Sequence, residues 1–245
     1  MFFSKLQDFV GYGTDILFPR RCAACGEKLF TSSKRRICND CRADIRFLHH
    51  PLCRSCGKEL GGDDSREYLC GDCLVDLPPY RLARSVVQYS SPIGKLLYGL
   101  KYGNDTTGMP GIGEIVSRFD MSPFAYCDTV MPVPLHPGRL RQRGLNQSVL
   151  LAKIFFRKQT ETVLNSHSLL RIRNTIPQTT LDGRLRRQNL RGAFSLVDED
   201  NVAGLTVCLV DDVFTTGTTV SECSRVLLDH GVKEVRVITL ARVVL

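Results

Sequence analysis

Eight cysteines arranged as four Cys-x-x-Cys motifs constrain this chain more than any other feature. All eight fall within one short segment of the 245-residue sequence. The motifs are Cys22 and Cys25, Cys38 and Cys41, Cys53 and Cys56, and Cys70 and Cys73. Two such motifs supply the four thiolates of a tetrahedral zinc site, and four protein ligands leave no open position for a substrate. The spacing therefore predicts two structural Zn²⁺ sites in zinc ribbons.

The grouping of the four motifs stays open at this level. The first two motifs and the last two can each hold one zinc, but an interleaved cross-brace fits the same spacing. His49 and His50 lie between the halves and are interpreted as linker residues, because four thiolates need no further ligand. The remaining cysteines are isolated and are interpreted as small core residues. They are Cys127, Cys208 and Cys223.

The cysteine segment divides the chain into two expected domains. Residues 1–80 are assigned to an N-terminal helix and zinc ribbons of the four-cysteine type, and residues 81–245 to a second domain. No apolar run is long enough for a transmembrane helix. Asp8 interrupts the place where a signal peptide needs its apolar run, so we expect a cytoplasmic protein.

The apolar residues of the second domain follow the spacing of strands in some segments and the spacing of helices in others. Strands are expected at 85–89, 129–133, 207–210 and 235–243, and helices at 93–100, 111–119, 145–157, 182–190 and 218–230. The segment 163–172 is ambiguous. Strands that alternate with helices predict an α/β fold with a parallel sheet flanked by helices.

The segment 207–219 carries the clearest binding chemistry. Its apolar strand is expected to end on Asp211 and Asp212, and a hydroxyl-rich loop around Gly217 then opens a helix. Backbone N–H groups at a helix N-terminus bind phosphate, and carboxylates accept hydrogen bonds from ribose hydroxyls. The hydroxyl donors of this loop are Thr215, Thr216, Thr218 and Thr219. The whole pattern predicts a phosphorylated-sugar site, whereas a Thr-Thr-Gly tripeptide alone indicates only a helix cap.

Positive charge is concentrated in residues 134–194. This span holds twelve Lys and Arg against two acids, a net charge of +10, which leaves −2 for the rest of a chain whose total is +8. One pyrophosphate does not need so many cations, so we expect the span also to bind nucleic-acid phosphates. The expected DNA- or anion-binding residues are Arg139, Arg141, Arg143, Arg184, Arg186, Arg187 and Arg191. Tyr98 and Tyr102 flank Lys101 and either stack on bases or pack in the core.

These motifs together resemble known proteins. Segment 207–219 is similar to the phosphoribosyl pyrophosphate signature of type I phosphoribosyltransferases, which implies ribose contacts at Asp211 and Asp212 and 5-phosphate contacts at 215–219. A second similar segment, Val133, Pro134, Leu135 and His136, implies the pyrophosphate loop. The chain carries the four cysteine motifs, then Leu100-Lys-Tyr102, then the segments 133–136 and 207–219. In this order of motifs it resembles the ComF family.

That resemblance implies a function in natural transformation. It predicts a competence protein for DNA uptake that binds single-stranded DNA on a phosphoribosyltransferase-like scaffold with a phosphoribosyl pyrophosphate-type site. It also implies Mg²⁺ with phosphoribosyl pyrophosphate or a nucleotide, other transformation proteins as partners, and a place at the inner face of the inner membrane. The alternative is an active phosphoribosyltransferase that releases pyrophosphate, although no residue pattern specifies its acceptor.

Overall fold

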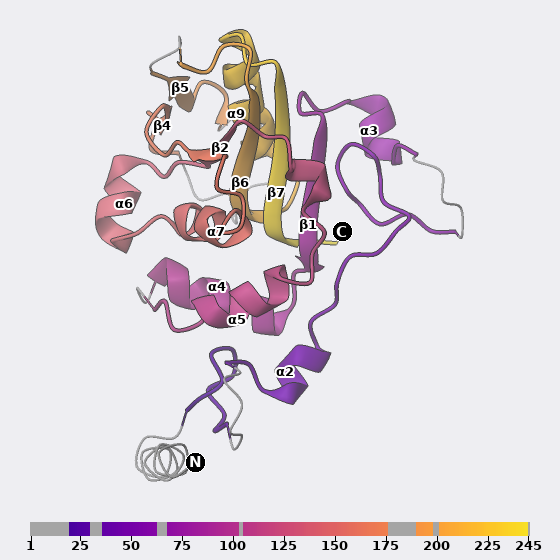
Figure 1. Ribbon diagram of the computed structural model, residues 1–245, viewed down its shortest axis with the longest axis vertical. Helices are drawn as coiled ribbons and strands as arrows, with labels where there is room; N and C mark the ends of the chain where they lie inside the picture. The colour runs from indigo at the N-terminus through magenta and orange to yellow at the C-terminus, as the bar shows by residue number, and fades with distance from the viewer. Residues whose placement is uncertain are drawn as a thin grey trace.

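Five parallel strands form the central sheet, in the order β1-β7-β6-β2-β3. Figure 1 labels β1, β7, β6 and β2 of this sheet. The computed structural model describes residues 20–29, 36–62, 68–102, 105–175, 190–197 and 201–244. Within them the strands are β1 (Leu82–Gln88), β2 (Thr129–Pro132), β3 (Val163–Leu164), β6 (Thr206–Phe214) and β7 (Glu234–Arg242). Every neighbouring pair in this sheet runs parallel, which confirms the predicted α/β class.

The two central strands are apolar on both faces because helices or loops cover both. In β6, Cys208 and Val210 belong to one hydrophobic core, and Val207 and Leu209 belong to the other. Successive side chains of a strand point to opposite faces, so a continuous apolar run is what a doubly covered strand requires. This burial explains why residues 207–210 show no polar alternation.

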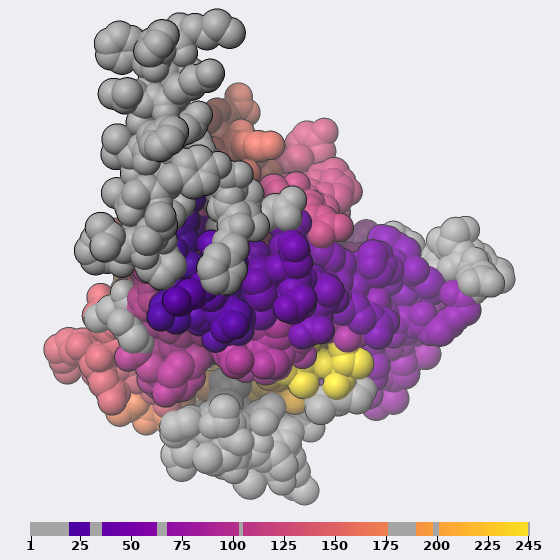
Figure 2. Space-filling view, turned by 90° about the horizontal axis from the view of Figure 1, so that it is seen from below, coloured from indigo at the N-terminus to yellow at the C-terminus, as the bar shows by residue number. Residues whose placement is uncertain are grey.

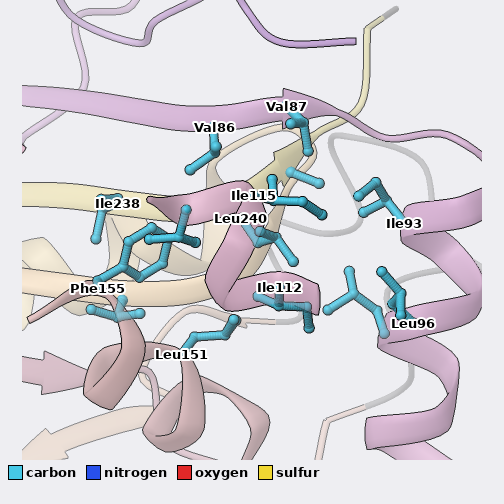
Figure 3. Close-up of a cluster of buried hydrophobic side chains, with 14 of the residues drawn as sticks. Val86, Val87, Ile93, Leu96, Ile112, Ile115, Leu151, Phe155, Ile238 and Leu240 are labelled. Carbon is cyan, nitrogen blue, oxygen red and sulfur yellow. The ribbon is translucent and has the colours of Figure 1, made fainter. Parts of the chain in front are cut away.

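Helices α4 (Ser91–Tyr102), α5 (Met109–Val116) and α7 (Gln147–Phe155) cover one face of the sheet. Figure 3 shows their contact with β1 and β7 through ten labelled apolar side chains. The labelled residues are Val86, Val87, Ile93, Leu96, Ile112, Ile115, Leu151, Phe155, Ile238 and Leu240. The opposite face packs against α9 (Thr218–Asp229) and the antiparallel pair β4 (Leu169–Arg171) and β5 (Phe194–Leu196).

Strand β6 and the segment ahead of α7 differ from what the sequence predicted. Strand β6 does not end at Val210 but continues through both aspartates to Phe214, because β7 extends equally far and pairs with it up to Arg242. Ahead of α7 lies a separate helix, α6 (Pro137–Arg143), which was not expected. It ends at Gly144, whose left-handed φ of 74° stops the helix and turns the chain into α7.

The isolated cysteines are core residues, as the sequence indicated. Cys127, Cys208 and Cys223 are at most 4% exposed. The ambiguous segment 163–172 contains β3 and β4. The expected N-terminal helix lies outside the described residues, and so do residues 182–189 of the helix expected at 182–190. Among the residues that the structure describes, no helix has both the length and the apolar character needed to cross a membrane.

Candidate functional site

The eight cysteines of the four motifs form two separate four-cysteine centres. Cys22, Cys25, Cys38 and Cys41 make one cluster, and Cys53, Cys56, Cys70 and Cys73 make the other, with all ligand atoms of a cluster within 4.8 Å of one another. The pairing is therefore sequential rather than interleaved. His49 and His50 belong to neither cluster.

The sulfur geometry fits zinc. The Sγ atoms of Cys25 and Cys38 are 3.7 Å apart, and those of Cys56 and Cys70 are 3.6 Å apart. A tetrahedral zinc with Zn–S bonds of about 2.3 Å has its sulfurs roughly 3.8 Å from each other. Both centres thus have the size and the closed thiolate set of a structural zinc site.

Backbone groups prepare these sulfurs to bind metal as thiolates. The N–H of Cys38 donates to the Sγ of Cys22 at 3.3 Å, and the N–H of Cys70 donates to the Sγ of Cys53 at 3.3 Å. Burial opposes ionisation of Cys53, yet the backbone donors, Cys70 first, lower its pKa to about 6. Donors to the ligand sulfur are the outer-shell support that metal sites use.

The second ribbon is joined to the core of the other domain. Gly57, with a φ of +72°, approaches β1 so closely that a Cβ there would lie 2.4 Å from the Ala83 carbonyl oxygen. Buried Arg242 donates to the Cys56 carbonyl at 2.7 Å and lies 3.6 Å from the Cys56 Sγ. Its guanidinium also stacks 4.4 Å from the centre of the Phe214 ring.

The first ribbon packs against the other core. Cys22, Ile37 and Cys41 are buried with residues of α4 and α5, and Arg42 forms an ion pair with Glu114 of α5. Figure 2 shows the indigo and purple residues of the ribbons spread over one face, next to magenta helical residues and the yellow end of the chain. The first centre thus belongs to the same hydrophobic core as α4 and α5, and the second centre belongs to the other core.

A cleft of about 250 Å³ opens where the carboxyl ends of β2 and β6 lie side by side. From β2 the chain continues towards β3, and from β6 it continues through α9 to β7 on the other side. Strand order thus reverses between β2 and β6, which is the place where open α/β sheets bind their ligands. The described lining includes 133–135, 211–215 and 217–220.

Two carboxylates lie at the floor of the cleft. Asp212 forms an ion pair with Lys101 of α4, and Asp211 accepts a hydrogen bond from Ser148 Oγ at 3.2 Å. Burial, and then the charge of Asp212, raise the pKa of Asp211 to about 7. Burial opposes the charge of Lys101, but attraction to Asp212 outweighs it and raises the Lys101 pKa.

The hydroxyl-rich loop turns sharply at Gly217 before α9 begins. Gly217 has a left-handed φ of +75°, and a Cβ there would lie 2.6 Å from Cζ of Phe214. Thr215, Thr218 and Thr219 line the cleft. The Oγ1 atom of Thr216 is 2.7 Å from that of Thr218, and Thr216 lines a separate groove beside the second ribbon. The loop therefore presents the N-terminus of a twelve-residue helix to the cleft.

Three of the four residues of the expected pyrophosphate loop line the cleft, and the fourth caps a neighbouring helix. Val133, Pro134 and Leu135 line the cleft. His136 is outside the cleft lining and caps α6, since its Nδ1 accepts from the Gly138 N–H at 3.2 Å. Asn146 holds the loop from behind, because its Nδ2 donates to the Val133 carbonyl at 3.0 Å.

Basic side chains give the cleft an excess of positive charge. Four cations and two carboxylates line its described part, a net charge of +2. The cations are Lys101, Arg139, Arg143 and Arg171. Arg139 donates to the Thr175 carbonyl at 2.5 Å, and Arg171 donates to the Thr175 hydroxyl. Burial, followed by the nearby like charges, lowers the pKa of both arginines.

The remaining expected arginines are not part of this lining. Arg141 and Arg191 are exposed. Arg184, Arg186 and Arg187 lie outside the described residues. Conversely, Lys101, Ser148 and Arg171 line the cleft without having been assigned to it. Lys101 was noted within the Leu100-Lys-Tyr102 motif, but spacing did not show that its side chain meets Asp212.

Two domain models match this chain in comparisons with known proteins. Residues 13–74 match the model of the double zinc ribbon domain, and residues 149–243 match that of the phosphoribosyl transferase domain.

Similar full-length proteins also exist. Competence protein F of Haemophilus influenzae is 32% identical over 238 residues, which cover 92% of this chain and 98% of that protein. DNA utilization protein YhgH of Salmonella typhi is 33% identical over 229 residues, 91% of this chain and 97% of that protein. Competence protein ComFC of Bacillus subtilis is 28% identical over 211 residues, 80% of this chain and 79% of that protein.

Proposed function

This chain belongs to the ComF family of competence and DNA utilization proteins, and from that premise we propose that it binds single-stranded DNA during DNA uptake. The proposal includes a ligand site of the phosphoribosyl pyrophosphate type on the same scaffold. The observation that carries the ligand site is the convergence of two carboxylates, a helix N-terminus and four cations on one cleft at the carboxyl ends of β2 and β6.

Each part of the proposed ligand matches a part of the cleft. In this proposal, Asp211 and Asp212 accept hydrogen bonds from the ribose hydroxyls. The loop 215–219 binds the 5-phosphate at the start of α9. Arg139 and the other cations of the cleft bind the pyrophosphate, because a guanidinium can donate two parallel hydrogen bonds to phosphate oxygens. The net charge of +2 favours such an anion over a neutral sugar.

Magnesium fits the same cleft. Carboxylate and phosphate oxygens are the ligands that Mg²⁺ prefers, and it commonly binds through one or two carboxylates together with substrate phosphates. Asp211 and Asp212 would hold it in this chain. When bound, Mg²⁺ would neutralise part of the charge of the pyrophosphate.

The single strand is proposed to bind largely outside the cleft. Arg141 and Arg191 are exposed and belong to the span of net charge +10. Contacts of this kind neutralise phosphates and release counterions, so affinity falls as salt rises. Such a protein would act on the cytoplasmic side of the inner membrane, together with other transformation proteins.

A crossed experiment tests the two parts separately. Asp211→Asn/Asp212→Asn changes the cleft, and Arg141→Glu/Arg191→Glu changes exposed charges outside it. Affinity for phosphoribosyl pyrophosphate with Mg²⁺ and for a labelled oligodeoxythymidine is measured for both variants. We expect the acid variant to lose the sugar ligand and keep the oligonucleotide, and the arginine variant to show the reverse.

The salt dependence of oligonucleotide binding makes this test quantitative. Each lost phosphate contact should reduce the slope of log affinity against log salt by about 0.7. An arginine variant with the affinity and slope of the original protein would show that these arginines do not bind DNA.

Transferase activity is the second candidate function, favoured by the presence of both carboxylates and the phosphate loop in one cleft. Its direct test is pyrophosphate release from phosphoribosyl pyrophosphate in the presence of nucleobases or amines. Release that depends on Asp211 and on an added acceptor would establish an enzyme, and its absence with every acceptor would favour the binding function.

A further inference from the structure

Two tyrosines on α4 are exposed although the sequence allowed a core position for them. Tyr98 is 65% exposed and Tyr102 is 64% exposed. They lie one helical turn apart, with ring centroids 4.8 Å from each other and ring planes inclined at 43°. The opposite side of α4 packs into the core through Leu96, Leu97 and Leu100. The tyrosines are therefore not needed to anchor the helix to the sheet.

The pair lies at the rim of the ligand cleft. Tyr102 lines the cleft, and its neighbour Lys101 reaches Asp212 at the floor. From α6, the guanidinium of Arg143 lies 5.2 Å from the centre of the Tyr102 ring. One short stretch of α4 thus connects the carboxylates of the cleft with two aromatic rings on the surface.

This combination fits a nucleobase attached to a phosphate chain. Exposed aromatic faces bind bases of any sequence by stacking, and neighbouring cations bind the backbone between them. Arg143 and the exposed Arg141 of the same helix supply such cations. Isolated exposed aromatic residues are common, but a contacting pair beside a cationic cleft is a surface with a defined ligand chemistry.

We propose that Tyr98 and Tyr102 form a stacking platform for the bases of single-stranded DNA at the rim of the ligand cleft, with Arg143 beside it for the backbone. The proposal rests on the proposed DNA-binding function and specifies where the bases bind. It also gives the residues of the Leu100-Lys-Tyr102 motif different roles. Lys101 contacts Asp212 in the cleft, and Tyr102 stacks on a base of the single-stranded DNA.

The test compares two oligonucleotides of equal length and charge. One is oligodeoxythymidine, and the other is its abasic counterpart, which keeps the phosphates and lacks the bases. The original protein should bind the first at least about fivefold more tightly, in line with the strength of base–aromatic stacking. Tyr98→Ala/Tyr102→Ala should abolish this preference, whereas Tyr98→Phe/Tyr102→Phe, which keeps both rings, should retain it.

An exposed tyrosine elsewhere provides the control. Tyr126 is 83% exposed and precedes β2, at the end of that strand opposite the cleft. Tyr126→Ala should bind both oligonucleotides as the original protein does. The chain contains no tryptophan, so Tyr102→Trp adds a single reporter whose fluorescence should be quenched by oligodeoxythymidine and not by the abasic strand.

The possible results separate the two proposals. If the double alanine variant keeps both its affinity and its preference for bases, the platform is wrong while the DNA-binding function stands. If the original protein binds neither oligonucleotide, the proposed function fails and the platform fails with it. If free thymidine monophosphate quenches Tyr102→Trp as strongly as the strand does, the platform serves a free nucleotide instead.

Discussion

Gly217→Ala is expected to destabilise the protein through its left-handed backbone and through a steric contact with Phe214. A left-handed backbone costs an L residue about 1–2 kcal/mol. The new Cβ would lie 2.6 Å from the Phe214 ring, and overpacking of this kind typically costs about 1–3 kcal/mol. The free energy of unfolding should therefore fall by about 2–5 kcal/mol.

The ring has little freedom to move away. The edge of Tyr80 faces it with centroids 6.4 Å apart, and the guanidinium of Arg242 covers it. Since Arg242 also donates to Cys56, displacement of Phe214 should disturb the second zinc centre. Gly217→Ala should accordingly release zinc faster to a chelator and weaken binding of phosphoribosyl pyrophosphate.

Gly204→Ala is the matched control. Gly204 has a φ of +76°, almost the same as Gly217, but no atom lies within 4 Å of the position that a Cβ would take there. It should lose only the backbone contribution of about 1–2 kcal/mol. Urea unfolding measures both variants and the double variant Gly217→Ala/Phe214→Leu, in which the steric part should be relieved. Equal losses for the two alanines, or no relief by leucine, would refute the steric reasoning.

Three further predictions concern the metal, the pH dependence and the buried ion pair. Cys56→Ser should lose one zinc per chain by metal analysis. It should also weaken binding of phosphoribosyl pyrophosphate more than Cys25→Ser, because Arg242 links Cys56 to Phe214, next to the loop 215–219; equal effects would exclude this link. Because the folded protein raises the pKa of Asp211 to about 7, its contribution to stability should decrease from about pH 4 to 7. Affinity for the sugar ligand should rise over the upper part of that interval as the carboxylate ionises; calorimetry at several pH values checks this, and a flat profile contradicts it. Lys101→Met leaves a buried, unpaired charge on Asp212 and should lower the free energy of unfolding by about 3–5 kcal/mol. Urea unfolding should show partial recovery of this loss in Lys101→Met/Asp212→Asn. The absence of that recovery would rule out the broken ion pair as the cause.

The zinc ribbons and the central strands were predictable because their signals are local. A Cys-x-x-Cys motif places both of its sulfurs by itself, and only the choice between sequential and interleaved pairing needed the structure. Likewise, the apolar run 207–210 requires two covered faces wherever it lies in the chain. The helix that follows Gly217 was also evident, because the glycine and the hydroxyl residues stand together.

The missed features depend on contacts between distant segments. Strand β6 continues past Asp212 only because β7 is long enough to pair with it. The contact of Lys101 with Asp212 joins α4 to β6, and no spacing within either element reveals it. The helical spacing of Tyr98 and Tyr102 placed both on one face of α4, but only the packing of α4 shows that this face is turned to solvent.

A calorimetric titration of phosphoribosyl pyrophosphate with Mg²⁺ tests the central claim most directly, since the claim is that the cleft between β2 and β6 binds this ligand. The account predicts saturable binding by the original protein and none by Asp211→Asn/Asp212→Asn, whose fold is checked by circular dichroism and zinc content. Failure of the original protein to bind the ligand, or binding with unchanged affinity by the folded double variant, would contradict it.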